Sequence, residues 1–185
     1  SIRGKNIFIA TTDTNWQTPY GIQLADKNKI QKILNFPKVS LNYQVFTNEH
    51  SIYVLVPFIK KVFPQAKIVP IIVRNNLDYK YFYNFGKNLS SKKSLLIISS
   101  DFSHYSTPEQ CQQNDTQSVN LLYSQEFNQS SNVNCDCTQC INLLYGFLSN
   151  IDTSFELVEN KKSTDFGEKN LENITSYISA YYIKK

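Results

Sequence analysis

The segment that most constrains the fold is a continuous apolar run, Ser94-Leu95-Leu96-Ile97-Ile98-Ser99-Ser100, which polar residues follow at once. A strand without alternation of apolar and polar residues is typical of a sheet that is covered on both faces. Helices cover both faces of the sheet in α/β proteins. We therefore predict that residues 94–100 form a buried central strand.

Strand and helix patterns alternate along most of the chain. Strands are predicted over 6–10, 67–74, 94–100, 155–159 and 174–183, and helices over 27–36, 49–63, 78–89, 108–125 and 141–148. This order predicts an α/β fold, a three-layer sandwich with a mixed, largely parallel central sheet, in a single domain covering residues 1–185. Pro70 places its strand at an edge or a bulge, and Pro57 should kink or break its helix.

Composition and charge exclude several classes of function. The formal net charge is only +4, and no basic run is interleaved with aromatic residues, so we expect no binding to nucleic acid. No apolar stretch approaches the ~20 residues of a membrane span, so we expect no membrane insertion. The chain starts at Ser1 and runs directly into a strand, which suggests that a preceding segment is missing. Cysteines clustered within a few residues favour a reducing compartment, and hence a cytoplasmic protein.

The residues after the apolar run carry the strongest chemical signal. Asp101 and His104 leave the carboxyl end of the predicted strand, where ligands bind in open α/β sheets. The two side chains could share a metal ion, orient each other, or act as an acid–base pair. The alternative is that Asp101 caps a loop and His104 is hydrogen-bonded in the core.

A second candidate lies at the predicted start of the helix over 49–63. Unpaired backbone N–H groups at a helix start favour an anion. The candidate residues for binding an anion or substrate are Glu49, His50 and Ser51, together with Ser100 at the strand exit. The alternative is that Glu49 and Ser51 simply complete a helix cap.

A third candidate is the cysteine cluster formed by Cys135, Cys137 and Cys140. Three thiolates can bind zinc or another soft metal ion, with Cys111 or a histidine as a fourth ligand. Alternatively, one cysteine is a reactive thiolate at a helix start, or the cysteines fill a tight loop as small apolar residues.

Several short stretches, in the same order along most of the chain, follow the pattern of one protein family. They are Pro19-Tyr20-Gly21, Glu49-His50-Ser51-Ile52, Leu55-Val56-Pro57-Phe58, Ile68-Val69-Pro70-Ile71-Ile72-Val73, Ser99-Ser100-Asp101-Phe102-Ser103-His104 and residues 173–182. They resemble the Memo-like proteins, also called AmmeMemoRadiSam system protein B. The resemblance implies a fold like that of class III extradiol dioxygenases, and an association with metal binding and redox chemistry.

The family's site combines histidines from the N-terminal region with the Asp and His of the signature and a cysteine in a Cys-Gly-x-x-Pro-Ile element. The resemblance therefore implies roles for Asp101, His104 and either Cys137 or Cys135. This sequence departs from the pattern in that Thr11-Thr12-Asp13 stands where a His-His pair is expected, and a His-Ala-Gly-Tyr segment is absent. The cysteine element corresponds to residues 135–141, without its Gly or Pro and with its register off by one residue.

The leading hypothesis is a Memo-like protein with a metal-binding or redox site at a strand end. In it, Asp101, His104 and Cys137 act in catalysis, and Asp101, His104, Cys135, Cys137 and Cys140 offer ligands to iron, copper or zinc. The alternatives are a non-catalytic module that acts with a partner protein, and a small structural zinc site in the cysteine cluster. The substrate and the question of whether the chain is an enzyme stay open.

Overall fold

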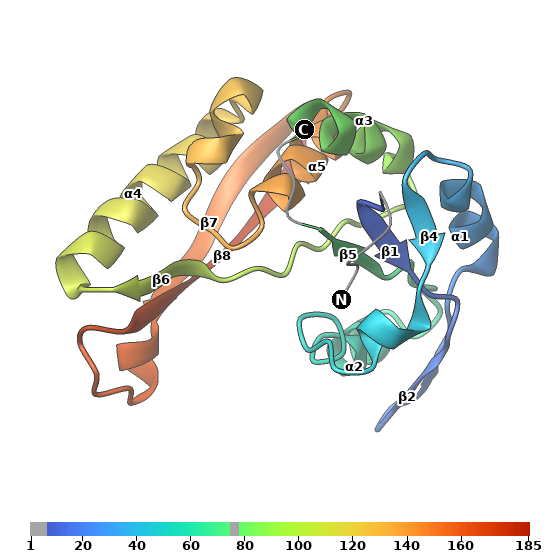
Figure 1. Ribbon diagram of the computed structural model, residues 1–185, viewed down its shortest axis with the longest axis horizontal. Helices are drawn as coiled ribbons and strands as arrows, with labels where there is room; N and C mark the ends of the chain where they lie inside the picture. The colour runs from blue at the N-terminus through green and yellow to red at the C-terminus, as the bar shows by residue number, and fades with distance from the viewer. Residues whose placement is uncertain (1–6, 75–77) are drawn as a thin grey trace. The chain divides into compact units, whose positions relative to one another are not determined.

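The structure is a computed structural model that describes residues 7–74 and 78–185 (Figure 1). The chain divides into two compact units, Ser1–Asn76 and Leu77–Lys185. Both contain helices and strands, so the prediction of an α/β protein is confirmed. The prediction of one domain covering the whole chain stays a prediction.

The first unit is built on a three-stranded mixed sheet with the order β4-β1-β5. The central strand β1 (Ile9–Thr11) is fully buried and pairs in parallel with β4 (Val39–Leu41) and antiparallel with β5 (Ile71–Val73). Because β5 lies at an edge, the placement predicted from Pro70 is confirmed. The remaining elements are β2 (Trp16–Thr18), β3 (Gly21–Gln23), α1 (Lys27–Leu34), η1 (Tyr43–Phe46) and α2 (Val56–Val62).

The helix predicted over 49–63 is shorter than expected. It starts only at Val56, with Pro57 in its first turn, where a missing N–H costs nothing. The preceding residues form a turn held by Glu49, whose carboxylate accepts hydrogen bonds from the backbone N–H of Ser51 at 2.7 Å and of Ile52 at 2.9 Å. Pro57 therefore opens the helix instead of kinking it.

The second unit combines an antiparallel sheet with helices (Figure 1). Its strands are ordered β6-β8-β7, and β7 (Thr153–Lys162) and β8 (Ile174–Lys184) form a long hairpin that β6 (Phe102–Ser106) extends. The other elements are α3 (Tyr79–Leu89), α4 (Pro108–Ser124), η2 (Phe127–Asn132), α5 (Thr138–Leu148) and η3 (Ser163–Phe166). The core cluster consists of Phe102, Leu122, Val133, Ile141 and Tyr145, and Tyr83 of α3, Phe155 of β7 and Ile178 of β8 pack against it.

Two predictions about the sheet are wrong. Residues 94–100 do not form a strand, and the side chains of Leu95 and Ile97 are 70% and 47% exposed, so this segment is not buried on both faces. The strand lies just after it, at Phe102–Ser106. The sheets are also not largely parallel: among the pairs formed by the strands named here, β1–β4 is parallel and the others are antiparallel.

No helix in residues 7–74 and 78–185 is both long and apolar enough to cross a lipid bilayer. A cytoplasmic location and a protein partner stay predictions.

Burial in the second unit predicts a loss of stability in alkaline solution. Desolvation raises the pKa of the Cys135 thiol from 9.0 to about 11, and it also raises the pKa of the Tyr145 and Tyr182 hydroxyls above 10.0. The folded state therefore holds these protons more tightly than the unfolded chain. The stabilisation that the protonated Cys135 thiol contributes is complete below pH 9 and is lost as the pH rises through 11. From Cys135 alone we expect a loss on the order of 2 kcal/mol by pH 11, measured as a falling urea midpoint by circular dichroism. A midpoint that stays constant from pH 8 to 11 would contradict this.

Candidate metal site

An irregular segment of β6 presents His104. Phe102 pairs with Ser176 of β8 and Ser106 pairs with Ile174, so β6 carries two more residues than β8 between these pairs. Extra residues on one strand bend it and redirect its side chains. The residues on either side of His104 both have positive φ, +24° at Ser103 and +48° at Tyr105. Neither is glycine, so the bulge is strained, at a cost of roughly 1–3 kcal/mol for each residue.

The loop that precedes α5 is joined to the start of β6 by backbone hydrogen bonds. The N–H of Asp136 donates to the carbonyl of Asp101 at 3.0 Å, and the N–H of Ser103 donates to the carbonyl of Asn134 at 3.3 Å. Between them, Cys135 forms an antiparallel bridge with Phe102. These contacts hold two segments that are more than thirty residues apart in the sequence side by side.

Three side chains converge where the two segments meet. The Nε2 atom of His104 lies 3.3 Å from Oδ2 of Asp101 and 3.1 Å from Oδ2 of Asp136. The side chains are 28%, 47% and 63% exposed for His104, Asp101 and Asp136, so the group is open to solvent. One ligand atom from each residue lies within 4.8 Å of the other two. Asp101 and His104 thus meet as predicted from the sequence, and Asp136 joins them.

The other ring nitrogen of His104 faces β8. Its Nδ1 atom lies 3.1 Å from the hydroxyl oxygen of Thr175, which is half-buried. When Nδ1 carries a proton and donates it to this oxygen, Nε2 is left with a lone pair directed at the two carboxylates. The Thr175 hydroxyl can also donate to Nδ1, so this contact is compatible with the tautomer in which Nε2 can bind a metal ion and does not by itself select it.

A buried carboxyl group anchors the segments that carry His104 and Thr175. Asp115 of α4 has no exposed surface. Its Oδ1 accepts hydrogen bonds from the hydroxyls of Ser103 at 2.7 Å and Ser176 at 2.6 Å. Its Oδ2 accepts one from the side-chain amide of Asn160 at 2.9 Å. Ser103 precedes His104 in β6, and Ser176 follows Thr175 in β8. Asp115 therefore holds in place both strands that supply the site.

The cysteines are placed differently from the sequence prediction. Cys137 and Cys140 form a disulfide bond, and in that form neither sulfur is a thiolate. Both were predicted as metal ligands, and Cys137 also as a catalytic thiol; neither role fits the disulfide-bonded state. The Cys135 thiol is free, but burial raises its pKa, with a smaller opposing effect from a hydrogen bond to Ser100. Cys135 packs against the core cluster, which agrees with the alternative of a small apolar residue.

The predicted anion-binding residues are engaged in local structure. Glu49 accepts hydrogen bonds from the backbone and hydroxyl of Ser51, but these close a turn and do not cap a helix, because the next helix begins only at Val56. His50 is exposed. The Ser100 hydroxyl lies 3.4 Å from the carbonyl oxygen of Asp101. A site that Glu49, His50 and Ser51 share with Asp101 and His104 stays a prediction.

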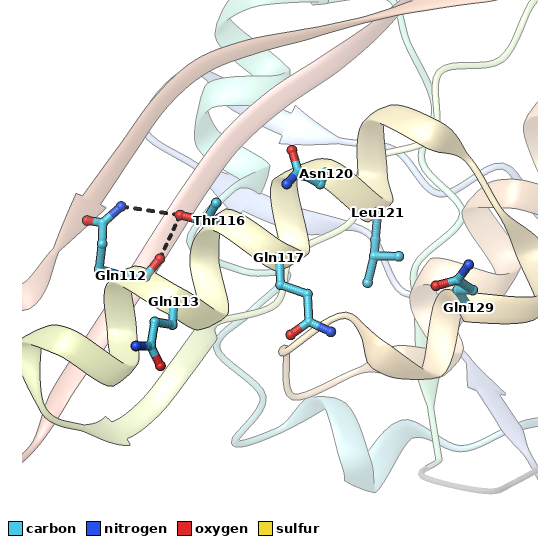
Figure 2. Close-up of a pocket in the computed structure, with 7 residues that line it drawn as sticks. All are labelled: Gln112, Gln113, Thr116, Gln117, Asn120, Leu121 and Gln129. Atoms are coloured by element: carbon cyan, nitrogen blue, oxygen red, sulfur yellow. Dashed lines mark hydrogen bonds between the residues drawn. The ribbon is translucent and has the colours of Figure 1, made fainter.

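A separate hollow lies along one face of α4 and carries no ionisable group (Figure 2). The residues that line it are Gln112, Gln113, Thr116, Gln117, Asn120, Leu121 and Gln129. Amide and hydroxyl groups of this kind offer no nucleophile, acid or base near neutral pH. His104 and its two carboxylate neighbours, and not this hollow, therefore stay the candidate site.

Comparison with known proteins identifies the family. The sequence model of the family described as "Memo-like protein" matches residues 2–181. The chain belongs to this family. It is 33% identical over 117 residues to a MEMO1 family protein of Aquifex aeolicus, which covers 60% of this chain and 43% of that protein. It is 35% identical over 98 residues to a MEMO1 family protein of Pyrobaculum aerophilum, covering 49% of this chain and 34% of that protein. The chain thus matches less than half the length of these relatives.

The sequence prediction missed Asp136. In the Cys-Gly-x-x-Pro-Ile element the cysteine stands five residues before the isoleucine. Five residues before Ile141 is Asp136, and its neighbours Cys135 and Cys137 lie one residue out of register on either side. The spacing was therefore a signal for Asp136, although its side chain is a carboxylate and not a thiol. The carboxylate of Asp136 is the group that contacts His104 from this loop.

Proposed function

We propose that this Memo-like chain binds a divalent transition-metal ion through Asp101, His104 and Asp136. The proposal rests on the convergence of three potential ligand atoms within 4.8 Å of one another. Bound there, such an ion would supply Lewis-acid or redox chemistry at a solvent-accessible site. The substrate class stays open.

The distances between the donor atoms suit one ion. Nitrogen and oxygen ligands lie at about 2.0–2.2 Å from zinc, so two neighbouring ligands are roughly 2.8–3.1 Å apart in octahedral geometry and roughly 3.3–3.6 Å apart in tetrahedral geometry. The two separations from His104 Nε2 are 3.3 Å and 3.1 Å. A small adjustment of the exposed carboxylates would complete the set.

An ordinary ion pair explains the arrangement less well. Exposed ion pairs contribute about 0–1 kcal/mol, whereas each strained residue costs roughly 1–3 kcal/mol. Ser103 and Tyr105 both carry that strain beside His104. The ion pairs therefore contribute less free energy than the backbone strain beside His104 costs. Such a balance is more typical of a binding or catalytic site than of a stabilising ion pair.

The three ligand atoms also limit which metal ions are expected to bind. One imidazole and two carboxylates suit iron(II) and zinc, whereas copper(I) prefers sulfur ligands. The nearby sulfurs are either joined in a disulfide or held as a buried thiol. We therefore propose iron(II) or zinc ahead of copper(I). We also propose that the fold is related to that of class III extradiol dioxygenases and has three layers, because the family resemblance implies both.

Titration calorimetry with iron(II) and with zinc would test the site. We expect one ion per chain, and a loss of at least tenfold in affinity in His104→Ala and in Asp136→Asn, since each removes a ligand. Cys137→Ser should bind as the unchanged chain does. Binding of zinc that is lost only in Cys137→Ser would instead support the structural zinc site, and absence of binding would support the non-catalytic module.

Thr175 provides a more selective prediction. Thr175→Val keeps the side-chain shape but removes the hydroxyl oxygen that can accept the Nδ1 proton when Nε2 binds a metal ion, and we expect metal affinity to fall by about 10–100-fold. Thr175→Ser keeps the oxygen and should bind almost normally. The measurement is the same calorimetric titration, with circular dichroism to show that the fold is kept. Equal affinities for the Val and Ser variants would exclude this role.

A further inference from the structure

The disulfide at the start of α5 is a chemical group that the proposed metal site does not use. Cys137 is the N-cap residue of α5, and Cys140 lies in its first turn. Their Cα atoms are 5.2 Å apart and only three positions separate them in the sequence. Both side chains are partly exposed, whereas Cys111 is fully buried.

A purely structural role explains this disulfide poorly. The stabilisation from a disulfide grows with the length of the loop that it closes, and this loop is among the shortest possible. The same turn is already closed by a hydrogen bond from the N–H of Cys140 to the carbonyl of Cys137, at 2.9 Å. The covalent link therefore adds little that the helix start does not supply.

The surroundings favour exchange with thiols. Partial exposure allows an external sulfur to approach. When the S–S bond breaks, negative charge develops on one sulfur, and the N-terminal end of α5 favours such charge. The adjacent acidic side chain, Asp136, is directed at His104, with 3.1 Å between Oδ2 and Nε2.

We propose that Cys137 and Cys140 are a reversible dithiol–disulfide pair that exchanges with a thiol reductant of the glutathione type. A thiolate of the reductant attacks one sulfur of the pair, the S–S bond breaks, and the other sulfur leaves with the electron pair and takes up a proton. A second reductant thiolate then attacks the mixed disulfide. The products are two thiols in this chain and one oxidised reductant disulfide, with two electrons and two protons gained by the pair. The exchange needs no metal ion.

The test uses the folded chain in glutathione buffers, followed by alkylation with N-ethylmaleimide and peptide mass analysis. In reduced glutathione we expect Cys137 and Cys140 each to gain a label, with no change in the circular dichroism spectrum. Glutathione disulfide should restore the unlabelled pair. The peptide with Cys111 is an internal control and should stay unlabelled while the chain is folded.

Reduction that occurs only in urea, or reduction that unfolds the chain, would overturn the proposal and indicate a structural disulfide. A double variant, Cys137→Ser with Cys140→Ser, should keep its urea midpoint, and a large fall in that midpoint would likewise indicate a structural disulfide. The experiment is repeated with His104→Ala. Because that variant lacks the proposed metal ligand, exchange in it separates the redox pair from the metal site.

Discussion

Gly146→Ala is expected to destabilise the second unit by about 3 kcal/mol or more, which is a large part of the 5–15 kcal/mol that stabilises a typical domain. The reason is the close approach of α3 and α5. A Cβ added at Gly146 would lie 2.0 Å from the carbonyl oxygen of Tyr83, and one added at Gly86 would lie 2.0 Å from that of Leu143. The two glycines thus face the opposing backbone reciprocally, and a backbone cannot rotate away as a side chain can.

The expected destabilisation is opposite in sign to the usual effect of replacing glycine by alanine in a helix, so it tests the packing of α3 against α5. In an exposed helix, replacing glycine by alanine stabilises by about 0.5–1 kcal/mol, because glycine loses more conformational entropy on folding. A large destabilisation therefore reports the contact between α3 and α5 and not the propensity of the residue. Urea denaturation followed by circular dichroism measures it.

Gly167→Ala is the matched control. Gly167 has φ of +100° and a Cβ there would meet nothing within 4 Å, so only the left-handed conformation resists the change. We expect a cost of about 1–2 kcal/mol. If Gly146→Ala were as stable as the unchanged chain, the close packing of α3 against α5 would be contradicted.

Asp115→Ala should cost about 3–5 kcal/mol, since buried groups that lose their partner each cost about 1–3 kcal/mol. The change would leave the hydroxyls of Ser103 and Ser176 and the amide of Asn160 without the acceptor that they share. These groups belong to three strands, β6, β8 and β7, so the loss is not confined to one element.

The same variant is expected to weaken metal binding, because Asp115 holds the neighbours of His104 and Thr175. Thermal denaturation and calorimetric titration should therefore change together. Asp152→Ala is the control: its side chain is 79% exposed and pairs with Lys185 at 3.7 Å, so we expect a change within about 0.5 kcal/mol and normal binding. A stable Asp115→Ala chain with unchanged affinity would show that the network does not support the site.

Local signals in the sequence predicted four of the helices to within a few residues at each end, whereas the helix expected over 49–63 spans only Val56–Val62. Asp26 and Asp78 each cap the helix that follows, through a hydrogen bond to the N–H three residues on. Pro108 opens α4, behind a capping box formed by Thr107 and Gln110. These interactions involve neighbours in the chain, so they could be read before any tertiary contact was known.

Strand pairing could not be predicted in this way. The apolar run over 94–100 showed that its side chains avoid water, but not which backbone it would pair with. The β7–β8 hairpin pairs instead with Phe102–Ser106, next along the chain. Pairing depends on contacts between residues that are distant in sequence, and the mixed, largely parallel sheet was inferred without them.

The candidate site was predicted in part. Asp101 and His104 are three residues apart in the sequence, and their contact arises in the irregular segment of β6, where Ser103 and Tyr105 have positive φ. The third member, Asp136, comes from a distant loop held by its own backbone hydrogen bonds. Cys135, Cys137 and Cys140 were predicted as soft metal ligands. Cys137 and Cys140 are joined in a disulfide, and Cys135 is a thiol that packs against the core cluster.

Anomalous X-ray scattering from a crystal soaked with zinc, recorded at the zinc absorption edge, would test the central claim most directly. We predict one strong peak at about 2.0–2.2 Å from His104 Nε2 and from one carboxylate oxygen of each of Asp101 and Asp136. The peak should disappear in Asp136→Asn. A peak bound by cysteine sulfur, or full zinc occupancy at a place that does not include His104, would contradict the proposed site.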